Sequence, residues 1–375
     1  MNTKYFFLRL LIALILPLGF FYIVDYIAVK NWDSSESLIV EVIEASPEKV
    51  LKTDQDNEAF TTLERDTVLK ILSDSRADEI VKVKTVRLAG SGPEVKPGGR
   101  YLLVWDVFDD GNVQYSLADG FRISNVATVI FAVCVILIAM AGTRGFLALL
   151  GLGASIAVLV FIMIPLMTQG WDPVLLALAS VFIISTVTIL CVVRYFRYML
   201  VALLGSLGGV LCGFLCGWIM VHIWQLTGLA GEGGALLAST LPALNMRGVL
   251  LASVLIGAIG AVLDVGVSVT ASMSEFVDYD NYIPLDRLLL AGLNVGGEVL
   301  GSMINTLILA YMGSALPMAI LINSAGVEFS AILNDPYIAQ EIVQGLAGTL
   351  GLLFTIPVTA FCFVFQESLR RRHDE

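Results

Sequence analysis

The feature that most constrains this chain is a series of apolar runs, each close in length to a membrane-spanning helix. The first covers residues 5–24, and the others follow residue 123: 124–142, 145–167, 173–193, 198–222, 248–272, 298–322 and 341–365. A helix needs about 20 apolar residues to cross the hydrocarbon core of a bilayer. Helices also satisfy their own backbone hydrogen bonds there. The runs therefore predict a membrane all-α helical bundle of about eight spans.

Composition agrees with an integral membrane protein that carries a smaller soluble part. Hydrophobic residues make up 57% of the chain, charged residues make up 15%, and the mean hydropathy is +0.84. Soluble domains are typically about 25% charged. The formal net charge is −11, which argues against a basic surface for nucleic acid, so we expect no nucleic-acid partner. The five cysteines all lie in apolar runs, and we expect no metal site and no cofactor.

Residues 1–29 are expected to form an uncleaved signal-anchor helix. Lys4 and Arg9 precede or open the first apolar run, and aromatic residues follow it. A cleavable signal peptide would instead end in a site of small residues. The N-terminus is therefore expected on the cytoplasmic side.

Residues 30–123 are polar and too long for a loop, so we expect a small domain there. SLIVEVIEA and EIVKVKTVRLAG alternate in the period-2 pattern of half-buried strands, and DDGN at 109–112 is typical of a hairpin turn. Between the strands, ERDTVLKILSD at 64–74 is a candidate helix. The expected shape is a compact β-barrel-like domain of about five strands, similar to an oligonucleotide-binding-type fold. Its role is either that of a spacer or assembly domain, or that of a ligand sensor.

The distribution of basic residues predicts the orientation of the chain in the membrane. With a cytoplasmic N-terminus, most basic residues outside the polar domain lie in the cytoplasm. These are Lys4, Arg9, Arg144, Arg194, Arg197, Arg287, Arg370, Arg371 and Arg372. The prediction is a multi-pass protein of a bacterial inner membrane, with both termini cytoplasmic and residues 30–123 extracytoplasmic. Residues 124–375 form its seven-helix membrane domain, with short interfacial or re-entrant helices expected in 223–247 and 327–340.

One span carries a regular stripe of glycines. Gly205, Gly209, Gly213 and Gly217 follow one another every four residues. Because lipid gives helices no hydrophobic reason to associate, small residues that allow close backbone approach favour helix packing in membranes. The stripe predicts a tight helix–helix contact, and a hinge or a substrate-lining groove is the alternative.

Two spans carry polar side chains at helical spacing. Residues 248–272 contain Asp264, Ser268 and Ser272, and residues 298–322 begin with Glu298 and contain Asn305 and Thr306. Steps of three or four residues place each set along one side of its helix. Ionisable groups inside a bilayer are costly and usually functional. We therefore identify a candidate intramembrane binding site at Asp264, Ser268, Ser272, Glu298, Asn305 and Thr306.

Asp264 lies near the middle of its span, and no lysine or arginine lies at a matching depth in any span. A buried carboxylate is then neutralised by a proton, a metal ion or a cationic substrate, or held by hydrogen bonds. One interpretation is a site on the path of an ion or solute. The other is a protonated aspartate that only joins two helices. The chain lacks the signatures of serine hydrolases, zinc proteases and P-loop enzymes, so we expect no enzymatic activity.

Two long motifs carry a resemblance to a known family. They are GAIGAVLDVGVSVTASMSE at 257–275 and NVGGEVLGSMINTLILAYMGSALP at 294–317. Together with the order of N-terminal helix, β domain and multi-helix block, they resemble the YibE/F-like family of bacterial multi-pass membrane proteins. The domain order is similar to the YibE-type member, which has the ectodomain. Shorter relatives lack it, so the resemblance implies a YibF-type partner subunit or a homo-oligomer, but no particular activity.

The sequence thus favours a transporter in the lipid bilayer for an unknown small solute or ion, with proton coupling as an option. The path would follow the polar site between helices 248–272 and 298–322. The alternative is a non-transporting assembly or sensor protein whose ectodomain binds a partner.

Overall fold

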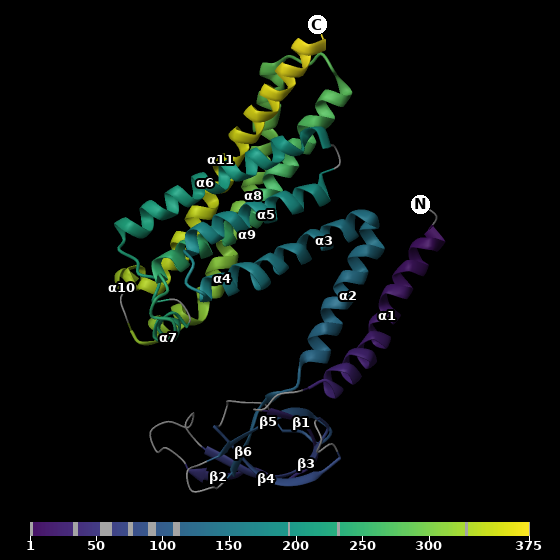
Figure 1. The fold of residues 1–375 in the computed structure, drawn as a ribbon, viewed down its shortest axis with the longest axis vertical. Coiled ribbons are helices and arrows are strands. Elements are labelled where there is room, and N and C mark those ends of the chain that lie inside the picture. Colours follow the sequence, from purple (N-terminus) through teal and green to yellow (C-terminus); the bar gives the residue numbers. More distant parts are fainter. Residues whose placement is uncertain are drawn as a thin grey trace. The chain divides into compact units, whose positions relative to one another are not determined.

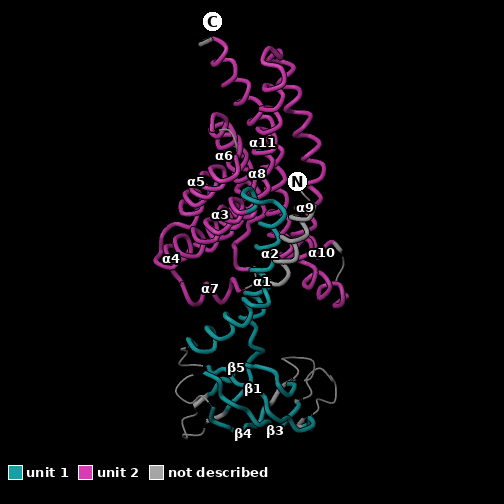
Figure 2. The backbone as a smooth tube through the Cα atoms, turned by 90° about the vertical axis from the view of Figure 1, so that its right-hand side faces the viewer, with its two compact units in different colours: residues 1–145 teal, residues 146–375 magenta. Residues whose placement is uncertain are grey.

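The computed structural model describes residues 3–32, 37–52, 62–73, 78–88, 95–107, 113–193, 196–230, 233–326 and 329–374. The chain divides into two compact units, Met1–Gly145 and Phe146–Glu375, which Figure 2 shows in teal and magenta. Unit 1 contains the described strands and the helices α1 (Thr3–Lys30) and α2 (Ile123–Ala141). The described part of unit 2 is helical.

Unit 1 holds one antiparallel sheet. Its strands are β1 (Ser37–Ala45), β2 (Lys49–Lys52), β3 (Thr62–Ile71), β4 (Ile80–Leu88), β5 (Arg100–Val107) and β6 (Val113–Gly120). The strand order is β2-β3-β1-β5-β6, and β4 pairs with β3 off this path. Leu38 and Val40 of β1, Leu69 of β3 and Leu103 of β5 are buried at the centre of its core. The alternation of apolar and polar residues along the strands places these side chains on one face.

The prediction of a helix at 64–74 is wrong, because residues 64–71 belong to β3. Thr67, Leu69 and Ile71 are all buried, which is the period-2 pattern of a strand. Residue Val68 pairs with Glu44 of β1 and with Lys82 of β4, so tertiary pairing outweighs the local helix preference.

The predicted barrel closure is also not seen, since no ladder among the described strands joins β6 to β4 and the sheet stays open. The DDGN turn at 109–112 lies outside the described residues.

The sheet is joined to both helices of unit 1 through one carboxylate. Asp25 of α1 forms an ion pair with Arg100 of β5 at 2.5 Å, and it accepts a hydrogen bond from the Ser124 hydroxyl of α2 at 3.0 Å. Farther along the two helices, Phe20 and Phe131 stack with ring centroids 3.9 Å apart. Figure 1 shows α1 and α2 side by side above the sheet. These contacts explain why the two helices and the sheet form one unit.

The seven apolar runs after residue 123 are confirmed as helices long and apolar enough to cross a membrane. The first apolar run lies within α1, whose backbone is helical as well. The apolar run at 145–167 follows α2 and forms three consecutive helical segments. These are α3 (Thr143–Ala157), a π-helical stretch at Val158–Met163 and α4 (Ile164–Thr168). The later long helices are α5 (Pro173–Val192), α6 (Met199–Ile223), α8 (Met246–Tyr279), α9 (Leu285–Ser324) and α11 (Pro336–Asp374).

Two short helices occupy the segments for which interfacial helices were predicted. They are α7 (Gly234–Thr240), between α6 and α8, and α10 (Phe329–Asn334), between α9 and α11. Both lie at the end of unit 2 opposite the C-terminus (Figure 1). Three of the long helices, α8, α9 and α11, extend beyond the spans predicted at 248–272, 298–322 and 341–365.

The core of unit 2 lies where α8 meets α5, α6 and α11. Val262, Val269 and Met273 of α8 are fully buried, as are Leu352 and Phe363 of α11. An apolar stripe at steps of three and four residues on each helix produces this arrangement. Helix α9 packs against α8 and α11 at the side of this core.

The glycine stripe of α6 lies directly against α11. A Cβ at Gly213 would lie 2.7 Å from the carbonyl oxygen of Ala347, and a Cβ at Gly209 would lie 2.8 Å from that of Gly351. A Cβ at Gly205 would collide with the hydroxyl of Thr359. The backbones of α6 and α11 thus approach as closely as glycine permits, which is how small residues hold helices together in lipid.

We expect Gly213→Ala to lower the stability of unit 2. The added Cβ would press on a backbone carbonyl, and overpacking of this kind costs about 1–3 kcal/mol. Thermal unfolding of the full-length protein in detergent micelles measures the loss. Gly153→Ala in α3 is the matched control, because nothing lies within 4 Å of a Cβ at that position. Equal unfolding midpoints for the two variants would contradict the described contact.

Candidate functional site

The predicted site residues of α8 lie on the side of the helix away from its buried face. Val262, Leu255 and Val269 are buried against the bundle, whereas Asp264, Gly257 and Gly260 are exposed. Ser268 and Ser272 are half-buried beside them. At 100° per residue, Asp264 is turned by about 200° from Val262. The α8 stripe, which we define as Ser253, Gly257, Gly260, Asp264, Ser268 and Ser272, therefore faces away from the core.

Helix α9 has the same arrangement. Gly292 and Gly296 are buried on the side that meets the bundle, and Glu298 and Asn305 are exposed on the other side. The α9 stripe consists of Asn294, Gly297, Glu298, Gly301, Ser302, Asn305 and Thr306, all of them exposed. No atom lies within 4 Å of a Cβ built at Gly297 or Gly301, so this side of the helix faces open space.

The two helices run antiparallel, and glycines lie at two of their mutual contacts. A Cβ at Gly292 of α9 would meet the side chain of Met273 of α8. Nearer the start of α8, a Cβ at Gly257 would meet the hydroxyl of Tyr311, which lies in the second half of α9. The pairing sets Asp264 at about the level of Ser302 along the bundle axis.

Among the described residues, no hydrogen bond joins the α8 stripe to the α9 stripe. The hydroxyl of Ser302 donates to the carbonyl of Val299 at 2.9 Å, and that of Thr306 donates to the carbonyl of Ser302 at 3.2 Å. Both bonds stay within α9. Within the described chain, Asp264 has neither a hydrogen bond nor an ion pair. The structure thus brings the predicted residues into two outward faces rather than into one enclosed cluster.

A lipid-facing carboxylate is unfavourable, since a charged side chain at the bilayer centre costs about 3 kcal/mol or more. Amide groups such as that of Asn305 also need partners in hydrocarbon. The two stripes are therefore suited to contact with water, an ion or another polar helix face. This need for polar partners is the main chemical property of the site.

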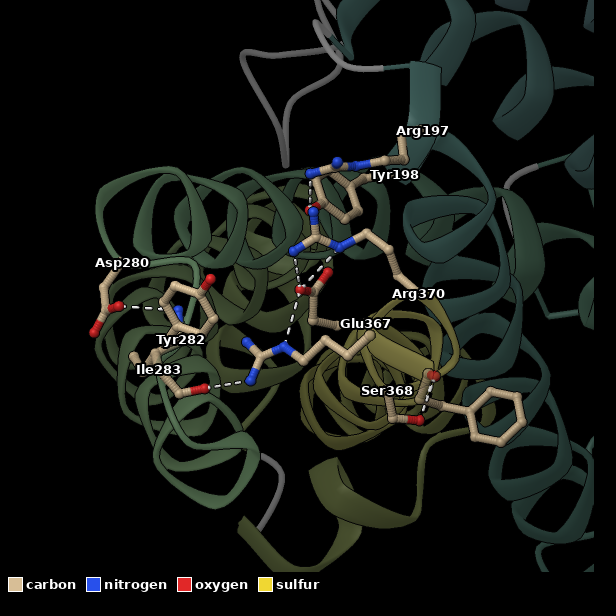
Figure 3. A network of polar contacts seen from close by, with 10 residues as sticks. Arg197, Tyr198, Asp280, Tyr282, Ile283, Glu367, Ser368 and Arg370 are labelled. Carbon is tan, nitrogen blue, oxygen red and sulfur yellow. Dashed lines mark hydrogen bonds and ion pairs between the residues drawn. The ribbon is translucent and has the colours of Figure 1, made fainter. Parts of the chain in front are cut away.

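A separate polar network lies at the end of unit 2 near the C-terminus (Figure 3). Glu367 of α11 has 1% of its side chain exposed and forms ion pairs with Arg370 at 2.5 Å and with Arg371 at 3.3 Å. Arg371 also donates to the carbonyl oxygen of Ile283, between α8 and α9, at 2.8 Å. The buried carboxylate thus joins the end of α11 to the α8–α9 connection.

The same network reaches the start of α6. Gln366 donates its side-chain amide to the carbonyl of Arg197 at 2.7 Å. The ring of Tyr198 stacks on Phe363 with centroids 4.5 Å apart. The Arg197 guanidinium lies over the Tyr198 ring, 4.4 Å from its centroid, and donates to the Tyr198 hydroxyl. Figure 3 shows Arg370 pointing toward Glu367 and the Arg197 guanidinium beside the Tyr198 hydroxyl.

Sequence reasoning missed Glu367 and the polar residues at the start of α11. The signal for Glu367 is its spacing of three and four residues from two arginines, which favours helical ion pairs. Gln340 and Glu341 lie at the edge of the apolar run at 341–365, where a polar pair is ordinary. Only the packing of α11 against its neighbours shows that Gln340 is buried.

A model of one protein family covers the whole helical part of the site. The family is described as YibE/F-like protein, and the match extends over residues 128–368. It includes both polar stripes, the glycine stripe and Glu367. The comparisons with curated proteins and with solved structures gave no match.

We expect Glu367→Gln to destabilise the protein strongly. Removing the negative charge leaves two arginine side chains without their counter-charge, and breaking a buried ion pair costs about 3–5 kcal/mol. Thermal unfolding of the full-length protein in micelles is the measurement. Asp286→Asn, an exposed carboxylate at the start of α9, is the control and should leave the unfolding midpoint nearly unchanged. A midpoint for Glu367→Gln within a degree or so of the control would show that the ion pairs contribute little.

Proposed function

The chain belongs to the YibE/F-like family, and we propose that it is a membrane transporter for a small solute or ion. The observation that carries the proposal is the position of Asp264. It lies near the middle of α8, exposed on a stripe of small and polar residues, with no cationic partner among the described residues. A protein that used the acid only to join two of its own helices would bury it between them.

Asp264 would be the group that takes up a proton or a cation. Ser268 and Ser272 would provide neutral oxygen ligands on the same helix face. Glu298, Asn305 and Thr306 of α9 would line the path beyond it, with Glu298 as a relay. Secondary transporters hold their substrates near the bilayer midplane, and Asp264 would lie at that depth. The proposal assigns no enzymatic activity to the chain.

The proposed location is a bacterial inner membrane with both termini in the cytoplasm. The ion-pair network supports this orientation, because Arg197, Arg370 and Arg371 gather at one end of unit 2. Basic residues near span ends favour the cytoplasmic side. The sheet of unit 1 would then be an extracytoplasmic domain, and α7 and α10 would lie toward the same outer side.

A second copy of the chain is the proposed cover for the α9 stripe. Amide and hydroxyl groups both donate and accept hydrogen bonds, so Asn294 and Ser302 can pair with the same residues across a two-fold axis. Gly297 and Gly301 are four residues apart and leave room for close approach of two helices. A YibF-type partner subunit is the other candidate for this cover. In that case the α9 stripe would contact a different protein and not a second copy of this chain.

A sensor function is favoured by one observation in unit 1. A hollow of about 810 Å³ lies on the sheet between β1, β3 and β4. Its lining includes the acids Glu44 and Asp66 and the bases Lys82 and Lys84. Mixed charges of this kind suit a polar partner. This function would not need Asp264.

We expect Asp264→Asn to reduce transport at least about ten-fold, since the amide cannot take up a proton or bind a cation as a carboxylate does. The measurement is uptake by purified protein in liposomes, assayed with a panel of ions and metabolites and with an internal pH dye. Asp264→Glu should retain part of the activity. Asp278→Asn, an exposed acid near the end of α8, is the matched control.

The contrary outcome can be recognised in cells. If Asp264→Asn fully complements a deletion phenotype while removal of residues 30–122 abolishes complementation, transport through Asp264 is the wrong function. The sensor function would then be favoured.

We expect Gly301→Cys to form disulfide-linked dimers on mild oxidation in membranes. A second copy packed through the α9 stripe brings the two Cα atoms within the roughly 7 Å that a disulfide requires. Gly153→Cys, an equally open glycine on α3, is the control, and both are made in a background without the native cysteines. If Gly301→Cys links only to a different membrane protein, or to none, the cover is not a second copy.

A further inference from the structure

A cavity of about 560 Å³ lies in unit 1, where the end of α1 meets the sheet. Leu72, which follows β3, and Arg100, at the start of β5, line it from the sheet. The rest of the lining belongs to one face of α1, since its residues are one, three or four positions apart. These residues are Tyr22, Asp25, Tyr26, Val29 and Lys30.

The cavity lies at the level where α2 begins its apolar span. Asp25 accepts a hydrogen bond from Ser124, the second residue of α2, and α2 is long and apolar enough to cross a membrane. Farther along the same two helices, Phe20 stacks on Phe131. Both helices therefore run from the cavity in the same direction, into the apolar part of unit 1.

The distance along α1 gives the depth of the cavity in a bilayer. Tyr26 and Lys30 lie two and six residues beyond the apolar run that ends at residue 24, or about 3 and 9 Å at 1.5 Å per residue. The headgroup layer is about 5–8 Å thick on each side of the hydrocarbon core. The cavity is thus at the depth of the lipid headgroups, where tyrosine is enriched as well.

The lining has one positive charge more than its carboxylate balances. The two oxygens of Asp25 accept from the Arg100 guanidinium and from the Ser124 hydroxyl. Lys30 lies over the ring of Tyr26, 5.6 Å from the centroid, and forms no ion pair with a described carboxylate. Two basic side chains and one occupied carboxylate favour a ligand with a single negative charge.

Arg100 and the tyrosines provide hydrogen-bond donors for such a ligand. A guanidinium has five N–H groups, and among the described residues only Nη1 of Arg100 has an acceptor. The Arg100 side chain is 37% exposed, and Tyr22 and Tyr26 are exposed as well. The planar guanidinium matches the geometry of phosphate oxygens. A phosphate group is therefore the anion that this lining fits.

The surroundings of the cavity favour a phosphate carried by a lipid. Val29 and Leu72 give the lining an apolar part, and Ile23 and Ile27 are exposed on α1. A free anion would leave these apolar surfaces without a contact. An ammonium group on the lipid headgroup would find no unoccupied carboxylate, because Asp25 already has two partners.

We propose that this cavity binds the headgroup of an anionic phospholipid that has one phosphodiester and uncharged hydroxyls, as phosphatidylglycerol has. The phosphate accepts hydrogen bonds from Lys30 and from the remaining N–H groups of Arg100. The headgroup hydroxyls bond to Tyr26, and the acyl chains lie along the exposed isoleucines of α1. Binding requires a membrane but no transport, so the two proposals are independent.

The test is a titration of the full-length protein, freed of lipid in detergent micelles, followed by native mass spectrometry. Dioleoylphosphatidylglycerol is the probe, and dioleoylphosphatidylethanolamine, which has the same acyl chains and an added ammonium group, is the matched lipid. We expect the first to bind at least about five-fold more tightly, as one basic residue near an anionic lipid contributes. Excess inorganic phosphate should not displace it.

Four variants locate the binding, each first checked for an unchanged unfolding profile. Lys30→Gln should weaken phosphatidylglycerol binding about five-fold and leave phosphatidylethanolamine nearly unaffected, and Lys30→Arg should retain the affinity. Arg100→Lys should cause a comparable loss, because one ammonium group cannot serve both Asp25 and the phosphate. Lys49→Gln is the control, since this exposed lysine of β2 carries the same charge and lies outside the lining. If Arg100→Lys changes the unfolding profile, Lys30→Gln alone decides.

Three results would overturn the proposal. The first is equal binding of the two lipids, and the second is wild-type affinity for phosphatidylglycerol in Lys30→Gln. The third is an equal loss in Lys49→Gln, which would show a general effect of surface charge. Displacement of the lipid by inorganic phosphate would also reject it, because the site would then take a free anion.

Discussion

The close approach of α6 and α11 is the contact on which the rest of unit 2 depends. Lipid supplies no hydrophobic drive for helix association, so packing must come from surfaces that fit closely. With Gly209 and Gly213 against the backbone of α11, the two helices form a narrow pair. Helix α8 then packs against both, with Ser206 of α6 at Gly266 and Gly351 of α11 at Val262. This fixes which side of α8 is buried.

The orientation of the polar faces follows from that packing. Once Val262 and Val269 are turned into the core, helical geometry turns Asp264 outward. Helix α9 is fixed in the same way, because Gly296 lies against Ile356 of α11 and Gly292 against Met273 of α8. Glu298 and Asn305 are then left on its far side. The two polar faces are thus a result of glycine packing elsewhere in the bundle.

The sequence predicted which segments are helical better than it predicted which helices pack against one another. Apolar length alone identifies a span, and the stripe from Gly205 to Gly217 indicates a close contact without naming α11 as its partner. The outward turn of Asp264 could not be predicted, because a polar face at helical spacing looks the same whether it faces a groove or a second chain. The segment at 64–74 shows a different failure. Its local pattern suggested a helix, but pairing with β1 and β4 makes residues 64–71 part of a strand.

The same packing keeps the polar face of α8 continuous over most of its length. Ser253 and Asp264 lie on this face and are separated by eleven residues, or about 16 Å at 1.5 Å per residue. The buried side of α8 packs against α6 and α11, and Gly292 and Gly296 hold α9 against α8 and α11. Because both helices are held by their buried sides, the α8 stripe and the α9 stripe keep their outward orientation together.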